Sequence, residues 1–187
     1  MGWSLPPTYV VFRENTMKKR IFSILLTLAL LLGTAGFTAI PAYAAIHNYA
    51  IYVGGIQVNE DNAADVLGDG TVSYDAATKT LTLNGANIDE CHTTDIFTAG
   101  IYTEIADLTV KLVGENRITV PMPDGSEVAV ASTKNIEISG TGKLWSNTYV
   151  VTGAQDVVIK NCEISSDWIC LSAMGDVTVE DATISGK

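Results

Sequence analysis

A unit of about 20 residues recurs four times in the second half of the chain, and a repeat of this length restricts the fold more than any other feature. In each unit an Asp or Asn precedes two apolar residues at alternate positions, as Asp107 precedes Leu108 and Val110. The later pairs are Ile136 and Ile138, Val157 and Ile159, and Val177 and Val179. Alternation with a period of two residues is typical of a β-strand, so each pair is expected to point inward from a short strand.

Each unit carries further apolar positions on both sides of this pair. Seven residues before its first member stand Ile101, Ala129, Val150 and Cys170, and seven to ten residues after it stand Ile118, Leu144, Ile164 and Ile184. Turns rich in Gly, Asn, Asp and Ser separate these positions. Each unit therefore predicts three short strands, which together form one coil of an all-β parallel β-helix, a solenoid with coils of about 20 residues.

Such coils are stable only when stacked, because a single coil buries almost no apolar surface. A leucine-rich repeat has a similar period, but it needs an L-x-x-L-x-L scaffold and often a helix. The units here are rich in Ile, Val and Thr, and no stretch after Ala45 has an extended apolar helical face. We therefore expect a β-helix.

The parallel β-helix repeats are expected to occupy residues 80–187. Leu81 and Leu83 belong to a partial unit, which places the first coil near Thr80. The spacing between units stretches before Gly100 and again at residues 121–127, and we expect loops projecting from the helix there. The chain ends in the middle of the pattern, so the sequence is expected to be truncated at its C-terminus.

Residues 45–79 follow a different pattern and predict an N-terminal β cap. Gly54-Gly55 separates two short apolar runs, which is a β-hairpin signal, and the turns at Asp69-Gly70 and near Asp75 indicate a second hairpin. A solenoid without a cap would expose unpaired strand edges and an apolar cross-section.

Residues 17–44 have the order of a secretory signal peptide. A Lys-Lys-Arg segment precedes an apolar run at residues 21–32, and Ala42-Tyr43-Ala44 provides small residues for cleavage before Ala45. The run is shorter than the about 20 apolar residues that span a bilayer, although a retained anchor is the alternative. We expect a secreted or cell-surface protein with no membrane span in the mature chain, and residues 1–16 are expected to come from a mis-called upstream start.

The mature domain is strongly acidic. From residue 45 onward the chain has 7 basic and 20 acidic residues, a net charge of −13. Nucleic-acid binding depends on neutralising phosphates with Lys and Arg, so no nucleic-acid partner is expected. Neutral polymers and divalent cations remain compatible with this charge.

Three cysteines make an odd number, which leaves at least one thiol unpaired within the chain. Cys91, Cys162 and Cys170 lack the CxxC or Cys/His spacing of a zinc site. We expect buried or incidental thiols.

Several segments carry a family likeness. The most specific part is Asp65 to Ile88, which contains DVLGDGTVSYD followed by TLTLNGA. The segment YVGG-x-QV precedes this part, and the segments GIY, DLTV, GEN and DVTVEDATISG follow it. Over Tyr49 to Lys187 the chain resembles bacterial secreted proteins described as carbohydrate-binding-domain proteins, which have a pectate-lyase-like right-handed parallel β-helix. The resemblance implies a right-handed coil, binding of plant cell-wall or acidic polysaccharide, and calcium as a partner.

One position of the repeat is a candidate for that cation. The residues Asp107, Asn135, Asp156 and Asp176 recur at the same point of each coil, and Ca²⁺ prefers several carboxylate and carbonyl oxygens. The alternative is turn chemistry, because short Asp and Asn side chains hydrogen-bond to the backbone at corners. A second acidic segment, LGDGTVSYD, lacks the spacing of an EF-hand.

Sugar binding usually needs exposed aromatic faces beside polar groups. The candidates are Tyr102, Trp145, Tyr149 and Trp168, all near coil turns or strand starts; partial burial at corners is the alternative for each.

No catalytic residues are predicted. Arg117 is the single Arg of the mature chain and is expected to be a solvated partner of nearby acids. The sequence favours a secreted carbohydrate-binding module, with polysaccharide as the partner. A structural or adhesive solenoid segment of a larger surface protein is the first alternative, and a calcium-dependent polysaccharide lyase or hydrolase is the second.

Overall fold

The computed structural model describes residues 45–121, 127–168 and 171–186. The predicted upstream segment 1–16, the signal peptide 17–44, most of the loop at 121–127 and Cys170 lie outside the described residues. Residues Ile46–Lys187 form one compact unit.

Every regular element in the described ranges is a β-strand, and no helix there has the length and apolar character needed to cross a bilayer. The strands form three sheets, called A, B and C here. Sheet A has the order β16 (Leu171–Ala173), β13 (Tyr149–Ala154), β10 (Glu127–Ser132), β7 (Thr98–Thr103), β1 (Asn48–Val53), β2 (Ile56–Asn59), and β6 (His92–Thr93) also pairs with β7. Sheet B has the order β17 (Val177–Glu180), β14 (Val157–Lys160), β11 (Ile136–Gly140), β8 (Leu108–Val113), β4 (Thr80–Asn84), β3 (Val72–Asp75). Sheet C has the order β18 (Thr183–Gly186), β15 (Glu163–Ser166), β12 (Lys143–Ser146), β9 (Glu115–Ile118), β5 (Asn87–Ile88).

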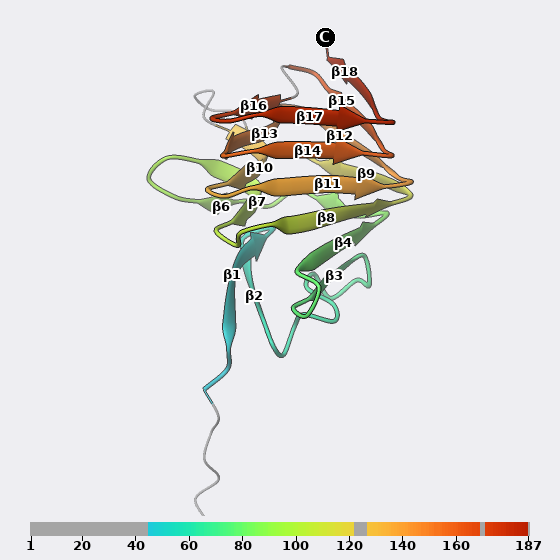
Figure 1. Cartoon of the computed structure of the whole chain (residues 1–187). Helices are drawn as coiled ribbons and strands as arrows, with labels where there is room; N and C mark the ends of the chain where they lie inside the picture. The colour runs from blue at the N-terminus through green and yellow to red at the C-terminus, as the bar shows by residue number, and fades with distance from the viewer. Residues whose placement is uncertain (1–44, 122–126, 169–170, 187) are drawn as a thin grey trace, which may run out of the picture. The chain divides into compact units, whose positions relative to one another are not determined.

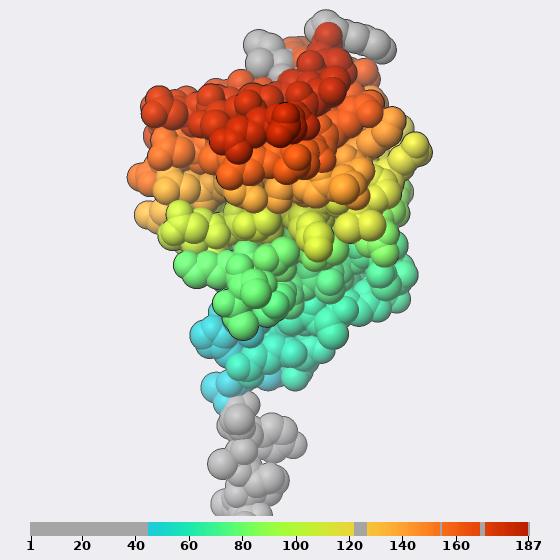
Figure 2. Space-filling view, turned by 45° about the vertical axis from the view of Figure 1, so that its right-hand side comes forward, coloured from blue at the N-terminus to red at the C-terminus, as the bar shows by residue number. Residues whose placement is uncertain are grey.

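The chain visits the three sheets in turn. The strands β7, β8 and β9 make one coil, and the next three sets of strands repeat it with parallel pairing between equivalent strands. Figure 1 shows these coils as layers, and the colours of Figure 2 follow one another in bands from the N-terminal to the C-terminal layers. Parallel strands in stacked sheets are consistent with the predicted β-solenoid.

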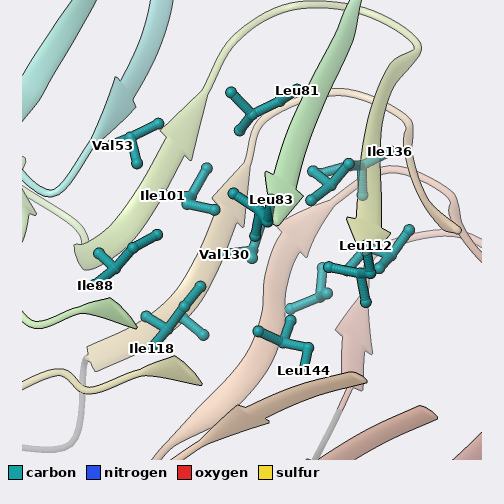
Figure 3. Packing of buried hydrophobic residues seen from close by; sticks show 14 of the residues in the cluster. Val53, Leu81, Leu83, Ile88, Ile101, Leu112, Ile118, Val130, Ile136 and Leu144 are labelled. Atoms are coloured by element: carbon teal, nitrogen blue, oxygen red, sulfur yellow. The ribbon is translucent and has the colours of Figure 1, made fainter. Parts of the chain in front are cut away.

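Sheet B has the register that the repeat predicts. Ile136 pairs with Leu108 on one side and with Val157 on the other, and Val157 pairs in turn with Val177. The side chains of Leu108, Ile136 and Val157 are buried. Figure 3 shows Leu81, Leu83, Leu112 and Ile136 reaching the same interior as side chains from the other two sheets. The alternating apolar residues thus build internal columns that hold successive coils together.

Burial in this column ends at the last coil. Val177 and Val179 have the predicted register, opposite Val157 and Ile159, but they are 45% and 47% exposed and not buried. The reason is geometric: β17 has β14 on one edge, and no strand of the described residues covers its other edge. Within the described residues, the last coil therefore leaves part of its apolar surface uncovered.

Sheet A departs from the predicted alignment by one residue. Ile101 pairs with Val130, whereas the repeat had aligned it with Ala129. In β7 two consecutive residues face the core, because a Cβ added to Gly100 would lie 2.4 Å from Cγ2 of Ile118 and Ile101 is also buried. Only a residue without a side chain fits at position 100 while Ile118 fills that space.

Two hairpins lie at the N-terminal end of the stack. The strands β1 and β2 pair antiparallel across Gly54-Gly55, and β1 also pairs antiparallel with β7. The strands β3 and β4 form the second hairpin, while β4, which begins at Thr80, pairs in parallel with β8. The strand β1 therefore pairs with β7 of the first complete coil, and β3 pairs with β4 of the partial coil.

A buried amide connects neighbouring coils at the turn into sheet C. The Asn116 side chain accepts a hydrogen bond from the Ala86 N–H at 2.9 Å and donates to the carbonyls of Val113 at 3.2 Å and Lys143 at 3.1 Å. These partners belong to three successive levels of the stack, so the Asn116 side chain links the backbones of neighbouring coils.

Candidate functional site

Two tyrosines stand side by side on the outer face of sheet A. Tyr52 of β1 pairs with Tyr102 of β7, and the neighbouring Ile51, Val53 and Ile101 are buried in the core. Because successive side chains of a strand point to opposite faces, both rings lie on the outside of the sheet. Their centroids are 6.3 Å apart.

A third ring comes from the segment that leads into β7. The short strand β6 pairs antiparallel with the start of β7, with His92 opposite Ala99. This pairing brings the His92 imidazole to 3.7 Å from the Tyr52 ring at an interplanar angle of 15°, and to 5.5 Å from the Tyr102 ring. In Figure 1 the green loop next to β6 and β7 stands out from the side of the stack.

The three rings line one open hollow of about 460 Å³, called the aromatic hollow below. Its other lining residues are Ala50, Gln57, Thr94 and Glu104. The hollow thus combines flat aromatic surface with an amide, a hydroxyl and a carboxylate, and its volume is within the about 300–1,000 Å³ that is common for small-ligand sites.

Hydrogen bonding and burial set the charge state of the hollow. The Tyr102 hydroxyl donates to Oε1 of Glu104 at 2.6 Å, and this bond, with burial, raises the pKa of Tyr102 to about 12. Burial lowers the pKa of the His92 imidazole below its ordinary value. At neutral pH the Tyr102 phenol is therefore protonated and the His92 imidazole is uncharged.

A second hollow of about 330 Å³ lies further along sheet A and is called the Phe97 hollow below. It is lined by Ile96, Phe97, Glu127, Val128, Tyr149, Thr152 and Ser172. The Phe97 ring packs against the small apolar cluster Ala99, Val128 and Ala131 on the outer face of the sheet. A Cβ added to Gly153, where φ is +83°, would lie 2.9 Å from the Phe97 ring, so glycine at this position leaves room for the ring.

The four aromatic candidates from the sequence fall into three places. Tyr102 lies in the aromatic hollow. Tyr149 lines the Phe97 hollow, and its ring centroid is 6.0 Å from that of Trp168, which is exposed. Trp145 stands apart on sheet C, where the Arg117 guanidinium lies 3.7 Å from its ring centroid. One face of Trp145 is therefore covered by Arg117, which is exposed, as expected, and contacts this ring.

The Asp and Asn column makes hydrogen bonds between coils. The Asp176 N–H donates to Oδ1 of Asp156 at 3.0 Å, and the Asp156 N–H donates to Oδ1 of Asn135 at 3.3 Å. The Asn135 amide donates to Oδ1 of Asp107 at 3.3 Å. In the described ranges no group of three His, Cys, Asp or Glu side chains is placed to hold a metal ion. The hydrogen bonds are those of turn chemistry, and a calcium site stays a prediction.

The described cysteines are poor nucleophiles. Cys91 and Cys162 are free thiols, and burial, followed by the nearby carboxylates, raises the pKa of Cys91 to about 11. Its thiol is therefore protonated at neutral pH, and thiolate is the reactive form.

Two residues of the aromatic hollow, Tyr52 and His92, were not among the candidates from the sequence. Tyr52 belongs to the hairpin region, outside the repeat, and His92 lies where the spacing of the repeat stretches. The alternation of Tyr52 with Ile51 and Val53 was a usable signal for an outward ring. Nothing in the sequence indicated that His92 would stack on it.

Comparison with known proteins adds no relative. No family model, no curated protein and no solved structure matches the chain. The likeness to secreted carbohydrate-binding-domain proteins therefore stays a prediction, and the geometry of the two hollows is what indicates a function.

Proposed function

We propose that the protein is a secreted or cell-surface carbohydrate-binding module built on a right-handed parallel β-helix, and that the aromatic hollow holds a sugar residue of a polysaccharide. The observation that carries the proposal is the grouping of Tyr52, His92 and Tyr102 around one hollow. The Glu104 carboxylate and the Gln57 amide line the same hollow. A pyranose ring has an apolar face rimmed by hydroxyls, so it suits a site of this composition.

The backbone supports this role by fixing the rings in advance. Tyr52 and Tyr102 are placed by strand pairing between β1 and β7, and His92 is placed by the pairing of β6 with the same strand. A preorganised aromatic surface loses little conformational entropy when a ligand binds, which favours affinity.

The Phe97 hollow supports binding to a chain longer than one sugar. It is made by other strands of the same sheet, and Tyr149 and Trp168 add aromatic surface beside it. Two hollows on one sheet suit a polymer that contacts the protein at more than one residue, and linked contacts raise avidity.

The test is retention on insoluble polysaccharides, with the secreted chain applied to cellulose, xylan, mannan and pectic acid gels. We expect retention on at least one neutral polymer, and we expect Tyr102→Ala to weaken that retention by about tenfold, since about 1.4 kcal/mol of lost contact corresponds to this factor. Trp145→Ala is the matched control, because it removes an aromatic ring from sheet C and leaves the aromatic hollow intact.

Two results would contradict the proposal. Equal retention of the wild type and Tyr102→Ala would remove the aromatic hollow from binding. A wild-type chain that passes through every polymer would favour the structural or adhesive alternative.

A further inference from the structure

We infer that the aromatic hollow takes neutral sugar residues and rejects uronates, and that Glu104 is the residue that sets this preference. The inference rests on the proposed function and narrows its ligand class, because the sequence had left plant cell-wall and acidic polysaccharides equally open.

The first observation is the charge of the lining residues. Glu104 is the only Asp, Glu, Lys or Arg that lines the hollow within the described part of the chain. A site for a uronate would need a Lys or Arg to pair with its carboxylate, and guanidinium is the group best suited to that geometry. His92 does not replace such a base, because burial lowers its pKa and leaves the ring uncharged at neutral pH.

The second observation is the fixed orientation of the Glu104 carboxylate. Its Oε1 accepts a hydrogen bond from the Tyr102 hydroxyl at 2.6 Å, which holds the carboxylate beside the Tyr102 ring in the lining of the hollow. An ionised carboxylate is an acceptor only, with about four lone-pair sites, so it has capacity for further donors after this bond.

These two observations have opposite consequences for the two ligand classes. The hydroxyls of a neutral sugar can donate to the remaining acceptor sites of Glu104, and hydrogen bonds to a charged acceptor are stronger than those between neutral groups. The carboxylate of a uronate has no proton to donate at neutral pH and meets a like charge instead. The net charge of −13 from residue 45 onward adds a repulsive field, although salt screens it beyond about 8 Å.

The experiment compares hexasaccharides of both classes by titration calorimetry at pH 7 in 0.15 M salt with a chelator present. The chelator is needed because a bridging divalent cation would mask the repulsion. The neutral probes are cellohexaose, xylohexaose and mannohexaose, and the acidic probe is hexagalacturonate. We expect the wild type to bind its best neutral probe on the order of tenfold more tightly than hexagalacturonate, as one like-charge pair at the edge of a site would produce.

The decisive variant is Glu104→Gln, which keeps an oxygen for the Tyr102 hydroxyl and removes the charge. We expect it to bind hexagalacturonate more tightly than the wild type does, and to narrow the preference for the neutral probe to less than about threefold. Glu163→Gln is the matched control, because it removes one carboxylate from β15 on sheet C and changes the net charge by the same amount.

Each outcome is interpretable. Wild-type binding to both classes with equal affinity, or a preference for hexagalacturonate, would overturn the inference and leave the proposed function standing. A change of preference in Glu163→Gln as large as that in Glu104→Gln would overturn the role of Glu104, since net charge alone would explain it. Absence of binding to all four probes would overturn the proposed function and this inference together.

Discussion

The difference in burial along one column of sheet B makes a quantitative prediction about stability. Val157 and Val177 are register partners on neighbouring strands, yet Val157 is fully buried and Val177 is 45% exposed. The same substitution at both positions therefore removes the same atoms from two different environments.

The expected loss follows from the atoms removed. Val→Ala deletes two methyl-sized groups, which corresponds to about 1.6 kcal/mol at roughly 0.8 kcal/mol for each buried group. At Val157 a cavity term adds to this loss, because strands on both sides keep the space open, and we expect about 2–3 kcal/mol. At Val177 about half of this 1.6 kcal/mol applies, because the side chain is already about half exposed, and no closed cavity forms. We therefore expect a loss of about 0.5–1 kcal/mol in unfolding free energy.

Urea unfolding followed by circular dichroism measures both changes. With a slope of about 2 kcal/mol per molar urea, Val157→Ala should lower the midpoint by about 1 M or more, and Val177→Ala by less than about 0.5 M. Equal shifts of the urea midpoint, or a larger shift for Val177→Ala, would refute the conclusion that Val157 is enclosed in the column while Val177 is partly open to solvent.

Three further predictions concern the hydrogen-bonded groups. Asn116→Ala should cost about 1–3 kcal/mol of unfolding free energy in the same urea assay, because it removes the hydrogen-bond acceptor of the buried Ala86 N–H. A loss below about 0.5 kcal/mol would contradict the role of this amide. The raised pKa of Tyr102 favours the protonated phenol in the folded state, so its contribution to stability is complete below about pH 10 and is lost as the pH rises toward about 12. Ultraviolet titration of the phenolates should show a step near pH 12, and a downward shift of that step in Glu104→Gln would confirm that the hydrogen bond to Glu104 is its largest cause. If the side chains of the Asp and Asn column only make hydrogen bonds in the turns, calcium and magnesium at equal ionic strength should shift the melting temperature equally. A calcium-selective shift that disappears in Asp156→Ala would establish a calcium site.

The repeat pattern was sufficient to predict the all-β architecture and the columns of sheet B. Period-two alternation determines which side chains point inward, and an Asp or Asn at a fixed point marks the corner before each strand, so Ile136 and Val157 were aligned correctly. The alignment failed in sheet A, where the pattern treated Ile101 and Ala129 as equivalent. Two consecutive residues face the core in β7 and also in β10 and β13, as Ala129 and Val130 show, and a strict period of two cannot represent this arrangement.

The site was harder to predict than the fold because it depends on contacts outside the repeat. Tyr102 was a candidate from the sequence, but its partners Tyr52 and His92 reach it through antiparallel pairing of β1 and β6 with β7. Repetition predicts contacts between equivalent residues of neighbouring coils, and among the described strands these two have no equivalent in the later coils. The stacking of His92 on Tyr52 required the folded backbone.

The most direct test of a sugar site at the aromatic hollow uses the two histidines of the chain as internal probes. His92 lines the hollow, whereas His47 packs against Tyr49, with ring centroids 5.0 Å apart, and lies outside it. Imidazole NMR signals are assigned by comparison with His92→Gln, and the chain is titrated with the neutral oligosaccharide that it retains best. The account predicts that the His92 signals move in a saturable way while those of His47 stay in place. Saturable binding that leaves the His92 signals unmoved would contradict it.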